Sequence, residues 1–273
     1  MATSTQRQLA REAAERYERI LVPAILGPFA EALVDWTSIV EGEVVLDVGC
    51  GTGTAARRAS EYTGASGRVN GIDANPGMIA VARSIAVSEE TAIEWQEASA
   101  DHLPHPDASV DVVLCAQTLQ FLENRSRALV EMNRVLKPGG RVSVSLWCEI
   151  QQNPYFDVLV AAITSHIGNE TASGLGATFG LTDHDEILAL LVGAGFERVE
   201  ISTTLLELVL PPMEDFVPLH ISATPMAIGF KAAPEESRRA VVQEIISRFD
   251  SFQVDDRNHR VPFSSYFARG YKV

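Results

Sequence analysis

Short strand-like segments alternate with stretches of helical periodicity through the first half of this chain. Segments that are short and rich in apolar residues predict strands at 44–48, 68–73, 93–97, 110–115 and 141–147. Between them, apolar residues recur every three or four positions, which predicts helices at 55–62, from Pro76 onward and at 125–136. Strands that alternate with helices favour a mostly parallel sheet covered on both faces.

The second half of the chain is more helical and less regular. Helical patterns at 151–168 and 183–193 enclose a stretch rich in Gly, Ala, Ser and Thr, residues 169–180, which predicts a mobile loop or lid. A strand that ends near Val209 and a final strand at 266–272 are separated by an insertion with two helical patterns, 213–231 and 235–252. We expect this insertion to help cover the carboxyl edge of the sheet.

Helical periodicity also precedes the first strand. Two helices are predicted there, at 5–22 and 25–37, because Pro23 interrupts the pattern. The chain shows no clean linker, so we expect one domain, 1–273. Its parts are N-terminal helices (1–40), a core (41–148) and two cap segments (149–182 and 211–258).

A glycine-rich turn follows the first predicted strand. Gly49, Gly51 and Gly53 let the backbone turn tightly and bring its N–H groups close to a ligand. The spacing Gly-x-Gly-x-Gly differs from the Gly-x-Gly-x-x-Gly of dinucleotide sites. Asp47, two residues earlier, would repel a phosphate but would hold an ammonium group. A glycine turn without any ligand is the alternative.

Two further carboxylates follow strands. Asp73 ends the second strand, where an acid accepts hydrogen bonds from ribose hydroxyls; the alternative is a helix cap. Asp101 follows the third strand, where it would accept from an adenine amino group; the alternative is a surface turn. Met78 would lie against the adenine ring or simply fill the core.

Composition narrows the classes of function. The chain has a net charge of −14, is 46% hydrophobic and 21% charged, and shows no Lys/Arg cluster. Nucleic acid is therefore a poor partner, and we expect none. The cysteines, Cys50, Cys115 and Cys148, lack metal-site spacing, so no metal is predicted. No signal peptide or membrane span is recognisable, and we expect a cytoplasmic protein.

With these motifs in order, residues 44–147 resemble the class I S-adenosylmethionine-dependent methyltransferases, in particular the ubiquinone/menaquinone-biosynthesis group. The matching pieces are Leu-Asp-Val-Gly-Cys-Gly-Thr-Gly at 46–53, Gly-Ile-Asp at 71–73, Pro-Gly-Met at 76–78, Ala-Asp-His-Leu-Pro at 100–104, Asp-Val-Val at 111–113 and Arg-Val-Leu-Lys-Pro-Gly-Gly at 134–140. The resemblance implies an α/β fold. We expect a Rossmann-like, doubly wound sheet of seven strands, mostly parallel with the last strand antiparallel, preceded by helices and carrying a helical cap inserted late in the chain.

The resemblance also implies the cofactor, S-adenosyl-L-methionine, with S-adenosyl-L-homocysteine as product. Position by position, it assigns cofactor binding to Asp47, Gly49, Cys50, Gly51, Asp73, Ala74, Met78, Ala100, Asp101, Cys115 and Gln117. Tyr17 has two readings: an ordinary amphipathic contact, or a side chain that faces the cofactor and the reaction centre.

The predicted activity is methyl transfer by direct displacement to a small, apolar or aromatic acceptor. Assembly into a homodimer stays open. No catalytic base can be assigned. His166 and His220 are weak candidates because they lie in the cap, and Tyr17 is a third. His102, His105 and His184 are candidates only because the ordinary pKa of an imidazole suits a general base. Two alternatives stay open: an S-adenosylmethionine-binding enzyme that catalyses a reaction such as cyclisation, or a non-catalytic binding protein.

Overall fold

The protein is built on one mixed sheet. The computed structural model describes residues 4–85, 93–255 and 258–273, and in this part of the chain seven strands follow the order β3-β2-β1-β4-β5-β7-β6. Their bounds are β1 Val44–Val48, β2 Arg68–Asp73, β3 Ile93–Glu97, β4 Val110–Ala116, β5 Leu136–Trp147, β6 Glu197–Leu210 and β7 His259–Tyr271. The first five strands are parallel, and β7 is antiparallel to both of its neighbours. The predicted fold class is confirmed.

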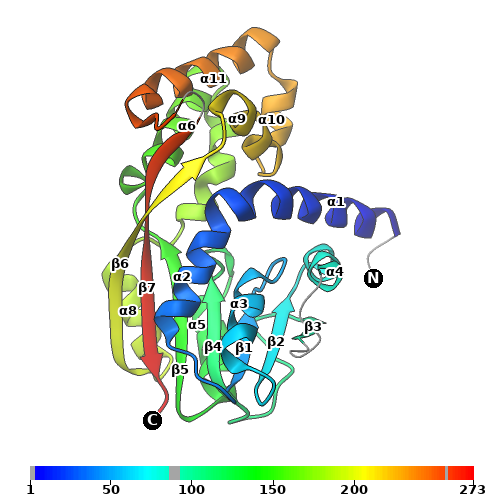
Figure 1. Cartoon of the computed structure of the whole chain (residues 1–273), viewed down its shortest axis with the longest axis vertical. Coiled ribbons are helices and arrows are strands. Elements are labelled where there is room, and N and C mark those ends of the chain that lie inside the picture. The colour runs from blue at the N-terminus through cyan, green and yellow to red at the C-terminus, as the bar shows by residue number, and fades with distance from the viewer. Residues whose placement is uncertain (1–3, 86–92, 256–257) are drawn as a thin grey trace.

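Helices cover both faces of the sheet, which explains why the central strands are apolar on both sides (Figure 1). On one face, α2 (Gly27–Thr37) and α3 (Thr54–Thr63) pack on alternate residues of β1, β2 and β4. On the other, α5 (Arg125–Val135) and α8 (His184–Gly193) pack on the remaining set. α4 (Pro76–Ser84) lies beside β2 and β3. Strand order reverses between β1 and β4, which is where sheets of this kind form a crevice.

The N-terminal helices are continuous, and the predicted break at Pro23 is wrong. α1 (Ser4–Leu21) passes through a π-helical turn, η1 (Val22–Leu26), directly into α2. The N–H of Gly27 donates to the carbonyl of Val22, five residues earlier. Pro23 has no backbone N–H group to donate, and the wider turn tolerates this missing hydrogen bond. The chain therefore bends without leaving the helix. As a result α1 crosses above the carboxyl edge of the sheet (Figure 1).

The helical stretch Arg11–Thr37 is long enough to cross a membrane, and it contains an 18-residue window that is apolar enough, with a mean hydropathy of 1.4. Half of its most apolar window is buried inside the protein. Its apolar residues, Ile25, Phe29 and Leu33 among them, belong to the interior that joins the sheet to the helices above it. Packing inside the protein therefore accounts for the apolar character of this stretch.

A helical cap stands on the far ends of β6 and β7, which run past the other strands (Figure 1). Its elements are α6 (Pro154–His166), α7 (Asn169–Ala172), η4 (Ser173–Phe179), α9 (Met213–Ser222), α10 (Ala227–Ala232) and α11 (Glu235–Phe249). Short 3-10 turns at η3 (Ile150–Gln152) and η5 (Asp250–Phe252) flank it. The loop expected at 169–180 is instead helical, and β7 begins at His259 rather than at Tyr266. The exact boundaries of core and cap segments remain predictions.

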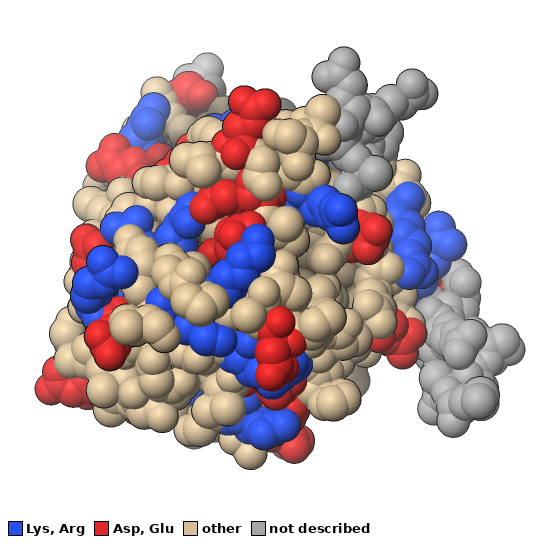
Figure 2. All heavy atoms as spheres, turned by 90° about the horizontal axis from the view of Figure 1, so that it is seen from below, with Lys and Arg blue, Asp and Glu red and all other residues tan. Residues whose placement is uncertain are grey.

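Charges of both signs mix on the face below the sheet. Figure 2 shows Lys and Arg atoms interleaved with Asp and Glu atoms on this face. Ion pairs such as Lys137–Asp111 at 2.8 Å and Arg141–Glu43 at 2.7 Å neutralise one another. This face therefore offers phosphates no continuous positive field.

Candidate functional site

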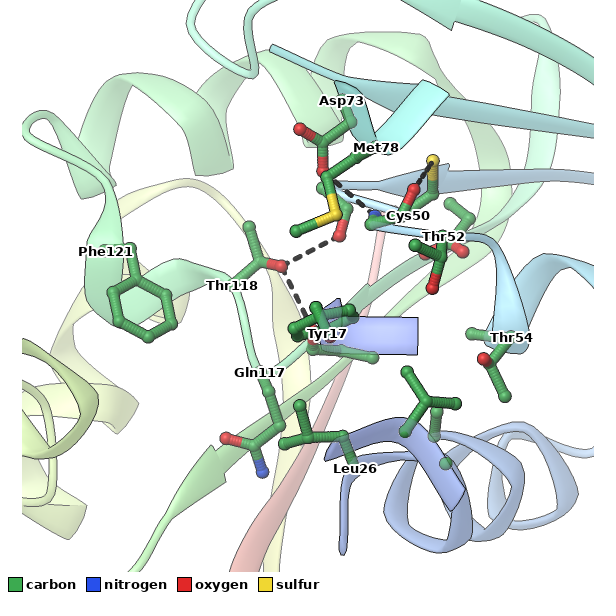
Figure 3. Close-up of a pocket in the computed structure, with 18 residues that line it drawn as sticks. Tyr17, Leu26, Cys50, Thr52, Thr54, Asp73, Met78, Gln117, Thr118 and Phe121 are labelled. Atoms are coloured by element: carbon green, nitrogen blue, oxygen red, sulfur yellow. Dashed lines mark hydrogen bonds between the residues drawn. The ribbon is translucent and has the colours of Figure 1, made fainter. Parts of the chain in front are cut away.

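The glycine turn lies at the carboxyl end of β1, beside the point where the strand order reverses. Gly49 has a φ of +70°, and a Cβ atom built on it would lie 2.1 Å from Cγ2 of Thr118. The Thr118 hydroxyl lies 3.0 Å from the carbonyl oxygens of Gly49 and Ala116 (Figure 3). Glycine is thus required at position 49 both by the backbone conformation and by the close approach of the segment after β4.

Asp73 fixes the opposite side of the turn. Its Oδ2 accepts from the N–H of Gly51 at 2.9 Å, and its Oδ1 accepts from the N–H of Asn75 at 2.8 Å. Asn75 in turn caps α4 by accepting from Gly77. Burial raises the pKa of the Asp73 carboxyl, and the two N–H groups oppose the rise. Each carboxylate oxygen keeps a further lone pair, so a structural role and a ligand role are compatible at Asp73.

A cavity of about 280 Å³ opens between the turn, α1 and the end of β4; we call it the polar cavity. Eight of the residues predicted to bind a cofactor line it: Tyr17, Asp47, Gly49, Cys50, Gly51, Asp73, Met78 and Gln117. Figure 3 shows Asp73 and Met78 at one end and Gln117 near the other, with Tyr17 between them.

The other predicted residues are not on this wall. Cys115 is fully buried within β4, and Ala100 packs against the same core. Asp101 lies in the loop after β3, where its N–H donates to Ser99 Oγ at 3.3 Å and its carbonyl accepts from Arg127 at 3.2 Å. Ala74 follows Asp73 but does not line the cavity. Cofactor contacts by these four residues remain predictions.

Three polar oxygens in the wall of the polar cavity lack a partner. Both carboxylate oxygens of Asp47 and the hydroxyl of Thr52 are buried without a hydrogen bond in the described part of the chain. Burial raises the pKa of Asp47 to about 7, and the N–H of Ala56, which does not reach a hydrogen bond of ordinary geometry, offsets part of the rise. Buried polar atoms are normally paired, so these oxygens are suited to a ligand with a positive group and an acceptor.

Tyr17 projects from α1 over the glycine turn. Its hydroxyl oxygen would lie 3.7 Å from a Cβ atom on Gly51. Burial and the carboxylates of Asp73, Glu18 and Asp47 raise the pKa of the Tyr17 hydroxyl above its ordinary value. Tyr17 therefore keeps its proton at neutral pH and is not poised to act as a base.

A second cavity of about 290 Å³ adjoins the first on the side of the cap; we call it the apolar cavity. Tyr17, Leu26, Gln117 and Phe121 line both cavities and form a shared wall between them. The rest of the lining comes from α1, η1, the segment after β4, the end of β5, α6, η4, α9 and the segment after α9, with mostly apolar side chains: Leu21, Ile25, Trp147, Phe156, Leu175, Ala223 and Pro225. The two spaces together have the size of ordinary small-molecule sites, about 300 to 1,000 Å³.

Of the candidate histidines, one lines either of these two cavities. His220, on α9, lies in the apolar cavity, 2.9 Å from the Tyr155 hydroxyl through Nδ1. His166 contacts Glu244 at 2.8 Å and lines neither cavity. His105 contacts Asn70, His184 contacts Asp185, and His102 is exposed. Position alone therefore separates His220 from the others.

Several residues on these walls were missed at the level of sequence. Thr52 and Thr118 carry local signals, since one lies within the glycine turn and the other follows β4. Gln120, in η2 (Leu119–Phe121), carries the same signal as Thr118, because the segment after β4 lies at the carboxyl edge of the sheet. Gly174, Leu175, Ala177 and Thr178, in η4, carry no local signal, because only the fold brings them to the apolar cavity.

The sequence and the fold are similar to those of known proteins. A family profile described as "Methyltransferase domain" matches residues 46–144. The demethylmenaquinone methyltransferase of Tropheryma whipplei (strain Twist) is 31% identical over 211 residues, which are 72% of this chain and 85% of that protein. The arsenite methyltransferase of Halobacterium salinarum is 33% identical over 168 residues, 61% of this chain but only 40% of that protein. The YcgJ protein of Bacillus subtilis shares the fold, with a TM-score of 0.55 at 17% identity over 89% of this chain and 97% of that one.

Proposed function

Since this chain belongs to the class I S-adenosylmethionine-dependent methyltransferases, we propose that it transfers the methyl group of S-adenosylmethionine to a small apolar or aromatic acceptor by direct displacement. The observation that carries the proposal is the pair of adjoining cavities. One is lined by the buried carboxyl group of Asp47, the half-buried carboxyl group of Asp73 and a glycine turn, and the other mostly by apolar side chains, with four residues common to both.

The polar cavity suits the cofactor of this family. Asp47, with both oxygens unpaired, would hold the amino group of the methionine portion, and the Thr52 hydroxyl would donate to its carboxylate. Asp73 would accept from the ribose hydroxyls, and Met78 lies at the same end of the cavity (Figure 3). The cofactor supplies a methyl group that is already activated by its positive sulfur.

The chain's own contribution is to position the acceptor and exclude water. Tyr17, Leu26, Gln117 and Phe121 surround the passage between the cavities, so the reacting atoms would meet there. Apolar walls hold an apolar acceptor and keep water away from the methyl group. An acceptor oriented by such walls needs little further help unless it must lose a proton.

The test uses the full chain with methyl-labelled S-adenosylmethionine. Calorimetric titration should show binding, and incubation with an extract of apolar metabolites should move label into a product that partitions into organic solvent. Binding without any labelled product would favour a non-methylating reaction such as cyclisation. Absence of cofactor binding would favour a non-catalytic protein and would overturn the proposal.

A further inference from the structure

Two polar side chains that line the apolar cavity, Gln120 and His220, are fixed in orientation by hydrogen bonds. In the described part of the chain, Oε1 of Gln120 is buried without a hydrogen bond, and His220 is bonded through Nδ1, which leaves its Nε2 for a ligand. Resting on the function proposed above, we infer that the acceptor is an apolar molecule with a free hydroxyl group, which donates to Gln120 Oε1, and with an oxygen that accepts from His220 Nε2.

Gln120 is held by a relay of hydrogen bonds that begins at the backbone. The Ser265 hydroxyl lies 2.7 Å from the carbonyl of Leu146 and must donate to it. Ser265 Oγ therefore accepts from Nε2 of Gln117 at 2.9 Å, which leaves Gln117 Oε1 to accept from Nε2 of Gln120 at 3.1 Å. The direction of every amide in the relay follows from that first hydroxyl.

The free end of the relay is an acceptor. Gln120 is 4% exposed, and its Oε1 is buried without a partner in the described part of the chain. A buried carbonyl oxygen without a hydrogen bond is unfavourable, so a ligand that donates to it gains affinity. Only a donor, such as a hydroxyl, satisfies it.

His220 is fixed in the same manner from the other side. The Tyr155 hydroxyl is buried, and its hydrogen-bond partner among the described residues is Nδ1 of His220, at 2.9 Å. A buried hydroxyl proton needs an acceptor, so Tyr155 donates and Nδ1 accepts. Burial lowers the pKa of His220 to about 3, so the ring is neutral and its single proton lies on Nε2.

Aromatic rings hold the imidazole in place. Its ring stacks on the ring of Tyr155, with 5.2 Å between the ring centres. The ring centres of Phe156 and Phe216 lie 5.9 and 5.6 Å from that of the imidazole. With Nδ1 occupied and Nε2 protonated, His220 has no lone pair for a substrate proton. It is therefore a residue that binds the acceptor rather than a base that deprotonates it.

Three probes that share the naphthalene ring system separate these two contacts: 2-methylnaphthalene, 2-methoxynaphthalene and 2-naphthol. The first forms no hydrogen bond, the second only accepts, and the third both accepts and donates. We expect the dissociation constant for the wild-type chain to fall by about tenfold at each step, as one hydrogen bond is added each time. Titrations with and without bound S-adenosylhomocysteine keep failure of the cofactor site distinct from failure of this inference.

Matched variants assign each step to one residue. Gln120→Leu should abolish the preference for 2-naphthol over 2-methoxynaphthalene and keep the other step. His220→Phe should abolish the preference for 2-methoxynaphthalene over 2-methylnaphthalene and keep the naphthol step. Ser265→Ala allows the side-chain amides of Gln117 and Gln120 to exchange the positions of their oxygen and nitrogen atoms. It should weaken the preference for 2-naphthol over 2-methoxynaphthalene without removing any atom from the cavity.

For each variant, the ratio of its affinities for two probes is compared with the same ratio for the wild-type chain. A general loss of packing weakens the binding of all probes alike and leaves these ratios unchanged. Three outcomes would overturn the inference: equal affinity of the wild-type chain for all three probes, a naphthol preference that survives Gln120→Leu, and failure of the wild-type chain to bind any probe.

Discussion

Asp47 gives the polar cavity its electrostatic character. It lies in β1, one residue before the end of the strand, and is 1% exposed, and neither carboxylate oxygen has a partner in the described residues. Such a group is disfavoured in its charged form until a cation arrives. Its protonation and the binding of a cationic ligand are therefore linked.

The linkage predicts proton release. Near pH 6, below the pKa of about 7 of Asp47, most of the free protein carries a protonated carboxyl; near pH 8 most of it carries the carboxylate. A bound amino group lowers this pKa, so S-adenosylhomocysteine should expel about one proton at pH 6 and few at pH 8. Calorimetry in buffers of different ionisation enthalpy measures the difference.

Two variants serve as controls for this experiment. Asp47→Asn should show no such release and should bind about 10- to 100-fold more weakly. Asp157→Asn, which alters an exposed acid on α6, should behave like wild type. Proton release of the same size from Asp47→Asn would show that another group is responsible.

Gly49 allows a direct separation of backbone strain from steric clash. Gly49 and Gly139 both have positive φ, +70° and +81°, but a Cβ atom at 139 meets nothing within 4 Å. Gly139→Ala should cost about 1 to 2 kcal/mol of unfolding free energy from conformation alone. Gly49→Ala should cost about 1 to 3 kcal/mol more, because it also displaces Thr118. Denaturant unfolding of both variants tests this. Equal losses of unfolding free energy would mean that Thr118 moves aside at no cost in free energy.

At the scale of the element, α1 is the part that closes the site. The π-helical turn at Val22–Leu26 directs it across the sheet edge, where it contacts α4 and α9. Tyr17 and Leu21 on its inner side line the cavities, whereas Arg11, Glu15 and Arg19 on its outer side are exposed. A helix held on one side only has little stability of its own, and ligand contacts should add to it.

Hydrogen exchange should report this directly. We expect S-adenosylhomocysteine to slow exchange of the amides of 11–21, while those of α5, which packs on the opposite face of the sheet, change little. The Tyr17→Ala variant should bind the ligand with less protection of the same helix. Unchanged exchange in α1 at saturating ligand would mean that this helix does not respond to the cofactor site.

For the molecule as a whole, cap and sheet share one apolar interior. Phe263 on β7 is fully buried and lies 6.3 Å from Trp147 of the sheet and 5.5 Å from Phe156 of the cap, measured between ring centres. The same interior reaches Phe29 of α2. Loss of one ring there should weaken both parts together.

We therefore expect Phe263→Ala to lower the unfolding free energy by about 3 to 5 kcal/mol. Tryptophan fluorescence and far-ultraviolet circular dichroism should show transitions that move together. Phe252→Ala, at a half-buried ring in η5, should cost clearly less. Separate transitions in the variant would show that the cap unfolds independently.

The extent to which the sequence predicted this molecule depends on how local each feature is. The family, the sheet and the glycine turn were predicted and are confirmed, because β1, Gly49 and Asp73 are encoded in short segments. The start of β7 was missed because Ser264 and Ser265 interrupt its apolar pattern. Their polar groups are satisfied by Asn153 and Leu146, more than a hundred residues away. The cap and an apolar acceptor were predicted, but most of the residues that line the apolar cavity were missed for the same reason, since they come from segments between residues 17 and 225.

The pairing of Leu210 with His259 means that residues 211–258 leave and rejoin the sheet at neighbouring backbone positions. A segment of different length and sequence can be spliced between these two points without shifting the strands below. The part of the wall that includes His220 therefore belongs to an insertion that the chain joins to the sheet only through β6 and β7. New acceptor preferences can arise there while the cofactor half of the protein stays as it is.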